Sequence, residues 1–546
     1  MMRFYVRLMV LVALGFIYQS AEAQFTRQDT LRGSVTPERA WWDLTHYHLD
    51  IEVSPSDSIL RGSNTISYKV LEESQVLQVD LQAPLEITQV TQDGEKLLLR
   101  SAGNAHFVHL KKPQNKGDIN KIEVSYEGQP HVAIRAPWDG GITWTKDNNG
   151  LDYVASSCQG IGASIWWPCK DHMYDEPDSM MISVTTPPHL MDVSNGQLIK
   201  TETRSDGKKT YHWKVTNPIN NYGVNLSVGD YVHFDEMYEG EAGPLKLDYF
   251  VLRDNLEKAK EQFKQVPIML DAFEHWFGPY PFYEDGFKLI EVPYLGMEHQ
   301  SAVTYGNGYN NGYLGRDLSG SGWGMKFDYI IIHEAGHEWF ANNITYKDIA
   351  DMWVHESFTT YSEALFVEYH HGKEAGAEYI RGMRTAIVND KPLIGSYGVN
   401  SRGSRDMYFK GSNILHTLRQ VVADDDLWRQ ILRGLNENFY HQTTTSAEVE
   451  EYISKKAGIG LDGFFDQYLR TKDVPILEYG YRNDRLGYRW TNAVSNFRMP
   501  IEVTIDGERH VLEAVTQWKN LPLETKPKSI KVDPDYYVGS LDIIGL

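Results

Sequence analysis

Alternating hydrophobic and polar residues mark the first part of the chain as β-structure. Apolar and polar positions alternate strictly in His46–Val53, and Thr65–Val70 repeats the pattern. Side chains of a strand point to its two faces in turn, so a period of two predicts strands with one buried face. Turn-forming pairs recur between such runs, at Asp93-Gly94, Asn195-Gly196 and Asp206-Gly207. We expect a large antiparallel β domain, preceded by a loose polar lead-in up to about residue 40.

The hydrophobic period lengthens to three or four residues near residue 254, which indicates helices. Over residues 255–277 one helical face collects apolar side chains, and Pro267 predicts a kink in that helix. Further helices are predicted at 324–343, 353–370, 408–422 and 446–456. After Val474-Pro475 the short alternating runs return, as in Ile501–Ile505.

A chain of 546 residues is too long for a single hydrophobic core. The changes of period therefore predict a multidomain α+β protein. We expect an N-terminal β domain over residues 24–236, a mostly helical domain over 237–473, and a small C-terminal β-sandwich over 474–546.

The first 23 residues have the features of a signal peptide. Arg3 and Arg7 form a basic start, Leu8–Ile17 is an apolar run too short to span a bilayer, and Ala21 and Ala23 are the small residues that a signal peptidase reads. Cleavage is expected after Ala23, and the alternative is an uncleaved anchor. The mature chain is expected to be exported, either to the periplasm or by secretion, without stable insertion in a membrane.

The chain carries a formal charge of −21, and removal of the leader, with its two Arg and one Glu, makes that −22. Such a charge argues against nucleic acid or anionic lipid as a partner. Cys158 and Cys169 are the two cysteines of the chain. Export permits a disulfide, but their spacing does not decide whether they pair, and two free buried thiols are at least as well supported. The oligomeric state is open as well.

Three residues have the spacing of a catalytic metal site. His333 and His337 lie four residues apart, and eighteen residues separate His337 from Glu356. Positions i and i+4 share one face of a helix, so two imidazoles so placed can bind one Zn²⁺. A catalytic zinc takes three protein ligands and keeps one open position. Glu356, on the next predicted helix, is the expected third ligand, and Glu334 is close enough to act on the water at the open position.

A His-Glu-x-x-His sequence also occurs by chance, so the flanking residues matter. Ile330, Ile331 and Ile332 lead into this segment, and Trp339 and Phe340 follow it. Two His and two Glu in such an apolar setting need a partner, and a metal ion is a suitable one. The alternative interpretation is an ordinary core helix, with Glu356 solvated or capping.

The chain resembles the M1 family of zinc aminopeptidases over about residues 40–475. The metal segment matches the family's zinc signature. Leu295–His299 resembles its exopeptidase motif Gly-x-Met-Glu-Asn, and Tyr408-x-Lys410-Gly411 resembles the segment that carries its catalytic tyrosine. Gln159, ahead of Trp167-Pro168-Cys169, resembles a family glutamine that helps to hold the amino end of the substrate. The chain looks like a short form that lacks the family's large C-terminal helical domain.

The resemblance implies a thermolysin-like catalytic domain and a site for one Zn²⁺ per chain. His333, His337 and Glu356 are the implied metal ligands, with Glu334 as general base and Tyr408 as oxyanion donor. Glu298, assisted by Gln159, Gly296 and Met297, is expected to bind the α-ammonium of a peptide with a free N-terminus. Leu295 and His299 depart from the motif, which puts the geometry of this loop in doubt more than the role of Glu298.

Two other functions fit parts of the pattern. The same zinc can serve an endopeptidase or an epoxide hydrolase. A non-catalytic scaffold that binds peptides is a second alternative, although such a module has no need of Glu334. The sequence leaves the preferred N-terminal residue open.

Overall fold

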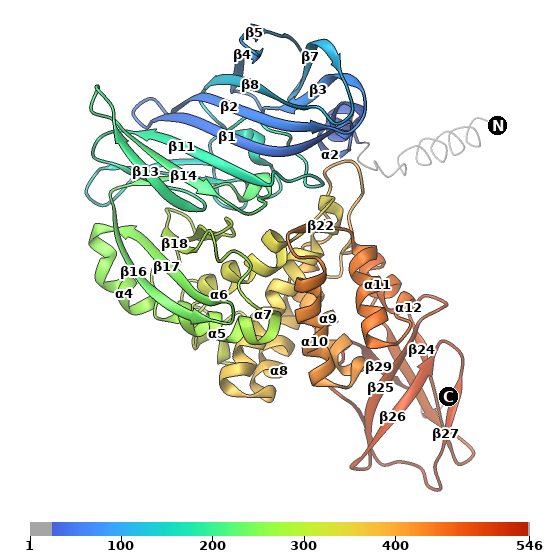
Figure 1. The fold of residues 1–546 in the computed structure, drawn as a ribbon. Coiled ribbons are helices and arrows are strands. Elements are labelled where there is room, and N and C mark those ends of the chain that lie inside the picture. Colours follow the sequence, from blue (N-terminus) through green and yellow to red (C-terminus); the bar gives the residue numbers. More distant parts are fainter. Residues whose placement is uncertain (1–24, 544–546) are drawn as a thin grey trace, which may run out of the picture.

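The computed structural model describes residues 25–543. Figure 1 shows a β-rich N-terminal part at the top, a helical middle part below it and a group of strands at the C-terminal end. The predicted signal peptide lies outside the described residues, so it stays a prediction. Among the helices of residues 25–543, none is long and apolar enough to cross a membrane.

The N-terminal part is built around an eight-stranded sheet in the order β13-β14-β11-β1-β2-β8-β4-β5. Its strands are β1 (Trp42–Ser54), β2 (Ile59–Val70), β4 (Glu86–Gln92), β5 (Glu95–Lys96), β8 (Ile119–Gly128), β11 (Ser179–Thr186), β13 (Gln197–Thr203) and β14 (Lys209–Val215). β1 and β11 pair in parallel, whereas the other neighbours are antiparallel as expected.

Two smaller sheets complete this part, in the orders β12-β15-β10-β9 and β3-β7-β6. Their strands are β3 (Ser74–Asp80), β6 (Leu98–Ala102), β7 (Ala105–Gln114), β9 (Gly141–Lys146), β10 (Asp152–Ser157), β12 (Met191–Val193) and β15 (Ser227–Gly229). Tyr47, Leu49 and Ile51, the apolar positions of the first alternating run, are fully buried in the core between the sheets.

The lead-in is more ordered than its polar composition predicts. It forms two short helices, α2 (Arg27–Gly33) and α3 (Pro37–Ala40). Arg32 pairs with Asp171 at 2.6 Å, and the fully buried Arg39 pairs with Asp80 at the same distance. The expectation of a loose segment was wrong because these two ion pairs attach the lead-in to the β domain.

The middle part begins with a five-stranded sheet in the order β16-β17-β18-β20-β19. Its strands are β16 (Tyr231–Gly240), β17 (Gly243–Leu252), β18 (Phe287–Glu291), β19 (Gly296–Met297) and β20 (Val303–Tyr305). The α-helices of this part are α4 (Leu256–Gln262), α5 (Gln265–Phe277), α6 (Tyr329–Gly336), α7 (Trp353–His371), α8 (Lys373–Gly382), α9 (Phe409–Val422), α10 (Asp425–Asn438), α11 (Ser446–Ala457) and α12 (Asp462–Arg470). β21 (Ile344–Tyr346) and β22 (Gln442–Thr444) pair in parallel across this part.

Two predicted helices differ from the observed ones. The segment 255–277 is interrupted at Phe263 and Lys264, and Pro267 lies in the first turn of α5, where its missing N–H leaves no helical bond unmade. The segment predicted at 324–343 contains only the short α6 as regular α-helix. Phe340 has non-helical backbone angles, with φ −125° and ψ 79°, and its carbonyl turns back to His337.

The C-terminal strands form the predicted small β-sandwich. One sheet has the order β27-β24-β23-β29 and the other β26-β25-β28. Their bounds are β23 (Ile476–Tyr481), β24 (Arg485–Thr491), β25 (Arg498–Ile505), β26 (Glu508–Val515), β27 (Lys519–Pro522), β28 (Ile530–Val532) and β29 (Gly539–Asp542). The multidomain α+β architecture is confirmed, while the exact residues at which one domain ends and the next begins stay predictions.

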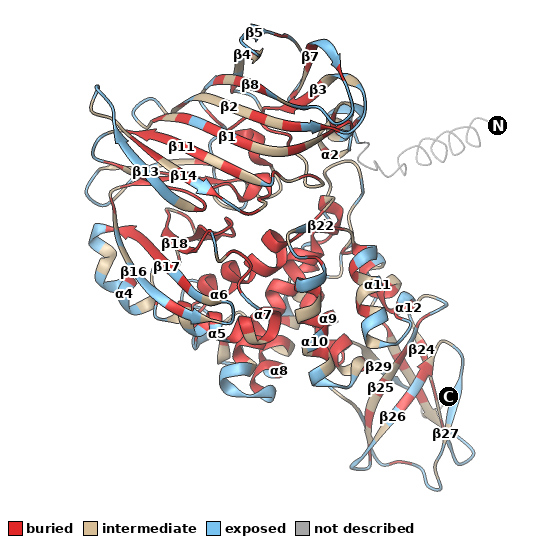
Figure 2. Ribbon diagram, in the orientation of Figure 1, coloured by how far each residue is buried: buried red, intermediate tan, exposed pale blue. Residues whose placement is uncertain are grey.

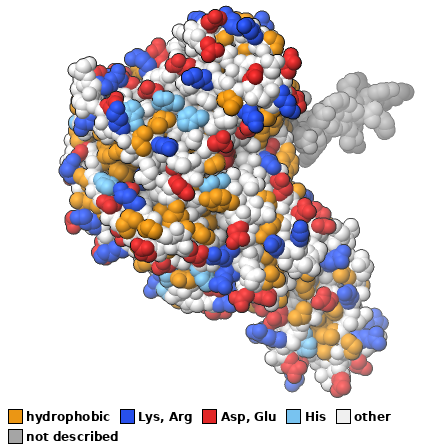
Figure 3. Space-filling view, viewed as in Figure 1, with side chains coloured by type: hydrophobic (Ala, Val, Ile, Leu, Met, Phe, Trp, Pro, Cys, Tyr) orange, Lys and Arg blue, Asp and Glu red, His pale blue; other side chains and the backbone are white. Residues whose placement is uncertain are grey.

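Burial is deepest in the middle part, where α6, α7 and α9 are almost continuously buried (Figure 2). Acidic and basic side chains are interspersed over the face shown in Figure 3.

Candidate metal centre and active site

Helix α6 carries the first two residues of the site. Asp328 caps its N-terminus by accepting a hydrogen bond from Ile330 N at 3.1 Å, and it also accepts from the Tyr305 hydroxyl at 2.7 Å. His333 and Glu334 lie on α6, and His337 is the residue that ends it. The apolar residues of α6 pack into the core around it, so both imidazoles are held on a rigid element.

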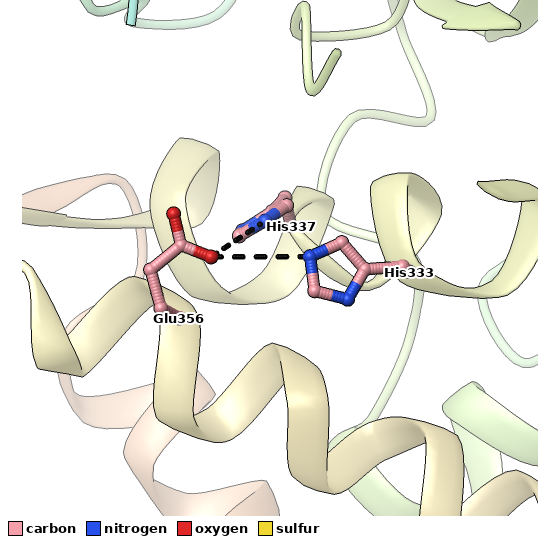
Figure 4. Close-up of side chains that lie close together, drawn as sticks. All are labelled: His333, His337 and Glu356. Atoms are coloured by element: carbon pink, nitrogen blue, oxygen red, sulfur yellow. Dashed lines mark ion pairs between the residues drawn. The ribbon is translucent and has the colours of Figure 1, made fainter. Parts of the chain in front are cut away.

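Helix α7 packs beside α6 and carries Glu356 in its first turn, as the spacing predicted. Glu356 Oε2 lies 3.8 Å from His333 Nε2 and 3.5 Å from His337 Nε2 (Figure 4). All three side chains are buried. Their ligand atoms lie within 4.8 Å of one another, which is close enough to surround one metal ion.

Contacts on the far side of each imidazole fix its orientation. His333 Nδ1 lies 2.7 Å from Glu363 Oε1, and Tyr379 donates its hydroxyl to Glu363 Oε2 at 2.7 Å. His337 Nδ1 lies 3.0 Å from the Phe340 carbonyl and 3.0 Å from Thr359 Oγ1. A proton on each Nδ1 satisfies these acceptors, and both Nε2 lone pairs then face Glu356.

The donor set fits zinc. Glu356 Oε1 accepts from Gln159 Nε2 at 2.8 Å, whereas Oε2 is buried without a hydrogen-bond partner among the described residues. A buried carboxylate oxygen without a donor is costly, and this one faces two imidazole nitrogens. Two nitrogens and one carboxylate oxygen are the ligand types of a catalytic zinc site.

Gln159 joins the N-terminal part to this centre. Its amide Nε2 donates to Glu298 Oε1 at 2.5 Å as well as to Glu356. Glu298 follows β19 and is buried, and Asn342 donates to its backbone carbonyl at 3.0 Å. Glu298, Glu334 and His337 also have ligand-type atoms within 4.8 Å of one another. The sequence-predicted residues Gln159, Glu298 and Glu334 are thus brought together with the metal ligands.

Gly296 and Met297 form β19, which packs directly against α6. A Cβ on Gly296 would lie 2.6 Å from Ile330 Cγ2 and 3.2 Å from Glu334 Cγ, so only glycine permits this contact. His299, which departs from the family motif, is buried, with Nε2 at 3.3 Å from the Ser156 carbonyl. Burial lowers the pKa of His299 to about 4. The loop therefore keeps Glu298 at the site with a neutral histidine behind it.

The electrostatics of Glu334 and Glu356 differ. Burial raises the pKa of Glu334 to about 7, with the positive charge of His333 opposing the shift. Burial also raises the pKa of Glu356, but the charges of His337 and His333 and the hydrogen bonds of His337 and Tyr408 together lower it to about 2. Glu356 is therefore a permanent anion, whereas Glu334 can gain and lose a proton near neutral pH.

Tyr408 lies just before α9, and its ring stacks on that of His333 with centroids 6.2 Å apart. Burial raises the pKa of Tyr408 well above its usual value, and the negative charges of Glu356 and Glu298 raise it further. The phenol therefore keeps its proton at neutral pH and can donate a hydrogen bond.

The predicted site residues line a cavity of about 550 Å³, among them the three metal-ligand residues with Gln159, Glu298, Glu334 and Tyr408. Pro137 and Trp138 border it from the N-terminal part, and Arg402 and Arg405 border it from the segment before α9. The sequence reasoning missed these four residues and Glu363. Glu363 lies seven residues after Glu356 on one helix, and that spacing on an apolar face was a usable signal. Loop residues such as Trp138 carry no comparable pattern.

Cys158 and Cys169 are both buried, and both are free thiols. Cys158 Sγ lies 3.2 Å from the Tyr222 carbonyl. Of the two alternatives that the sequence left open, the structure has the buried thiols.

Comparison with known proteins identifies the family. Residues 262–468 match the peptidase family M1 domain, and residues 44–222 match the peptidase M1 N-terminal domain. Probable aminopeptidase 1 of Sulfurisphaera tokodaii is 21% identical over 486 residues, which cover 82% of this chain and 57% of that protein. Endoplasmic reticulum aminopeptidase 1 of Rattus norvegicus is 24% identical over 314 residues, which cover 55% of this chain and 33% of that protein.

A solved structure has the same fold. The M1 zinc metallopeptidase of Deinococcus radiodurans superposes with a TM-score of 0.69 at 21% identity, covering 82% of this chain and 98% of that one. The present chain spans only 57% and 33% of the two curated relatives. Both family domains lie in the expected order and cover the zinc segment and the β domain, and the chain therefore belongs to peptidase family M1.

Proposed function

We propose that this protein is a zinc-dependent aminopeptidase that releases N-terminal residues from peptides. One observation carries the proposal: the Gln159 amide links Glu298 to the metal-ligand carboxylate of Glu356. This places a second buried carboxylate beside the metal site, at a position suited to a substrate ammonium.

His333, His337 and Glu356 are the residues that would hold the zinc. When bound there, zinc supplies a Lewis acid that polarises the scissile carbonyl and acidifies water. The remaining chemistry belongs to side chains of the protein.

Glu334 is proposed as the general base. It takes a proton from the attacking water and passes it to the leaving amine, and a pKa near 7 suits both transfers. Tyr408 is proposed to donate its phenolic hydrogen to the oxyanion that forms at the carbonyl. One such donor contributes roughly 3–4 kcal/mol to transition-state stabilisation.

Glu298 and Gln159 are proposed to fix the amino end of the substrate. An ammonium ion paired with Glu298 holds the first peptide bond, and no later one, beside Glu334 and Tyr408. Gly296 supports this arrangement by letting β19 approach α6, and Met297 anchors β19 in the core of the N-terminal part. The proposal is supported by the curated relatives named as aminopeptidases. It is also supported by the Deinococcus radiodurans protein, which has been solved with the substrate Tyr-Ser-Ala bound.

The test compares free-amine peptides with their N-acetylated forms, in the wild type and in Glu298→Ala. The wild type is expected to hydrolyse only the free-amine peptides. Glu298→Ala is expected to lower kcat/KM for them by roughly 100-fold, because a buried carboxylate bonded to an ammonium contributes about 3 kcal/mol.

Equal hydrolysis of acetylated and free peptides by the wild type would instead indicate an endopeptidase. Loss of all turnover on removal of the metal with a chelator, and its return on addition of zinc, is the matching control for the metal.

A further inference from the structure

Two arginines border the active-site cavity without an ionic partner. Arg402 and Arg405 lie in the segment that leads to Tyr408, both side chains are exposed, and both line the cavity. Within residues 25–543, no carboxylate pairs with either guanidinium, although the protein as a whole is strongly acidic. Two free cations at the edge of a cavity need an explanation that general surface charge does not give.

The nearest acid in the sequence is already occupied. Asp406 follows Arg405 directly, and its carboxylate accepts the backbone N–H of Val388 at 3.0 Å and that of Asn389 at 2.6 Å. These bonds hold the 402–408 segment to the chain at 388–389. Asp406 therefore fixes the segment and leaves both guanidinium groups free for a ligand.

The charges of the cavity are arranged in two groups. Glu298, Glu334 and Glu356 form an acidic group around the metal site, and Arg402 and Arg405 form a basic group on the segment that carries Tyr408. Arg402 is close enough to Tyr408 for its positive charge to lower the pKa of the phenol, although burial raises that pKa by more. In the proposed function the ammonium binds Glu298 and the scissile carbonyl faces Tyr408, so the leaving part continues beyond Tyr408, whose segment also carries the two arginines of the cavity lining.

We propose that Arg402 and Arg405 bind a carboxylate on the leaving side of the substrate, and that the preferred substrates are short peptides whose own C-terminal carboxylate reaches them. This inference rests on the proposed aminopeptidase function and adds the substrate class to it. A guanidinium pairs with a carboxylate through two parallel hydrogen bonds, which makes arginine the suitable residue. The cavity of about 550 Å³ has the size of a pocket for a small ligand.

The carboxylate can come from the chain end or from an acidic side chain, and paired peptides separate these sources. Leu-Ala-Ala with a free C-terminus is compared with its C-terminal amide. Leu-Ala-Glu amide is compared with Leu-Ala-Gln amide. The wild type is expected to have a KM for the free acid roughly tenfold below that for the amide, with little change in kcat. A preference confined to the Glu peptide would assign the same arginines to acidic side chains.

The variants are Arg402→Gln, Arg405→Gln and the double variant. Each is expected to raise the KM of the carboxylate peptide toward that of its uncharged partner. The double variant is expected to have the same KM for both peptides of a pair. Arg100→Gln is the matched control, since Arg100 is an exposed arginine of β6 in the N-terminal part and does not line the cavity.

Two failures can be told apart. If the wild type hydrolyses no free-amine peptide or aminoacyl arylamide, the proposed aminopeptidase function is overturned and the inference with it. Suppose instead that the wild type hydrolyses arylamides but has the same KM for both peptides of each pair, or that the double variant keeps the wild-type difference in KM. Either result overturns only the role of Arg402 and Arg405.

Discussion

At the scale of single residues, the site depends on groups that do not line the cavity. Glu363 and the Phe340 carbonyl hold the two imidazoles by their Nδ1 atoms, so both Nε2 atoms face Glu356 before any metal arrives. The His-Glu-x-x-His spacing predicted which residues come together. It does not include these outer partners: Glu363 is indicated only by its separate seven-residue spacing from Glu356 on α7, and the Phe340 carbonyl reaches His337 through non-helical backbone that no spacing predicts.

Glu363→Gln is expected to weaken zinc binding by about 10- to 100-fold, because the amide holds His333 less firmly and lowers its basicity. Competition with a chromogenic chelator measures the affinity. Glu437→Gln, at an exposed position of α10, is the control. An unchanged affinity in Glu363→Gln would mean that α6 alone orients His333.

The buried His299 predicts a pH dependence of stability. Its pKa in the folded protein, about 4, lies below the usual 6.5 because of burial. The unfolded chain therefore binds the extra proton between pH 6.5 and 4, and stability is lost as the pH falls through this window. Between pH 7.5 and 5 the free energy of unfolding is expected to drop by about 2 kcal/mol from this group.

Urea unfolding at the two pH values tests this expectation. His299→Asn, which restores the asparagine of the family motif, should remove that part of the drop, whereas His189→Asn at an exposed position should not. The same drop in wild type and His299→Asn would assign the pH dependence to other groups.

At the scale of elements, the site is assembled by close packing of a few helices. Hydrophobic period predicted α7, α9 and α11 closely, because long amphipathic patterns determine which face is buried. It failed between residues 337 and 343, where polar and apolar residues alike are buried in an irregular turn. Because the segment is buried on all sides, no alternation of polar and apolar residues distinguishes a helix from a turn there.

The contact between α7 and α9 predicts a sensitive position at Gly411. A Cβ there would overlap Ser357 Oγ and lie 2.7 Å from Ser357 Cβ, one residue after Glu356. Gly411→Ala is expected to cost about 1–3 kcal/mol of stability and to lower kcat/KM, because α7, which carries Glu356, must separate from α9, which begins directly after Tyr408.

Adding Ser357→Gly removes the overlapping atoms, so the double variant should recover much of the activity that Gly411→Ala loses. Gly460→Ala, at a glycine with open space around it, is the control. Additive losses in the double variant would show that the overlap is not the cause.

At the scale of the whole molecule, two hydrophobic cores meet at the site. Met297 packs in the core of the N-terminal part, and Ile330 of α6 packs in the core of the middle part. Composition and period predicted three kinds of domain, but they could not predict this junction, because contacts between distant segments leave no periodic pattern. The resemblance to a family was needed to connect Gln159 with Glu298.

The core of the middle part continues into the C-terminal sandwich. Arg381 pairs with Asp535 at 2.6 Å, and the Tyr468 hydroxyl donates to the Tyr537 carbonyl at 2.8 Å. Calorimetry is expected to show these two parts unfolding in one transition, which Asp535→Ala shifts to lower temperature by a few degrees. A separate early transition that Asp535→Ala leaves in place would indicate an independent C-terminal unit.

The double hydrogen bond of Gln159 has a consequence for dividing the chain. Its partners Glu298 and Glu356 lie 139 and 197 residues away in sequence. A protein expressed as two fragments, cut between the N-terminal sheets and β16, keeps every proposed zinc ligand on the second fragment. That fragment alone lacks the amide that bridges the two carboxylates. Recovered selectivity for free-amine peptides would therefore report that the fragments have reassociated. Metal content is a less direct measure, because the second fragment has every proposed zinc ligand by itself.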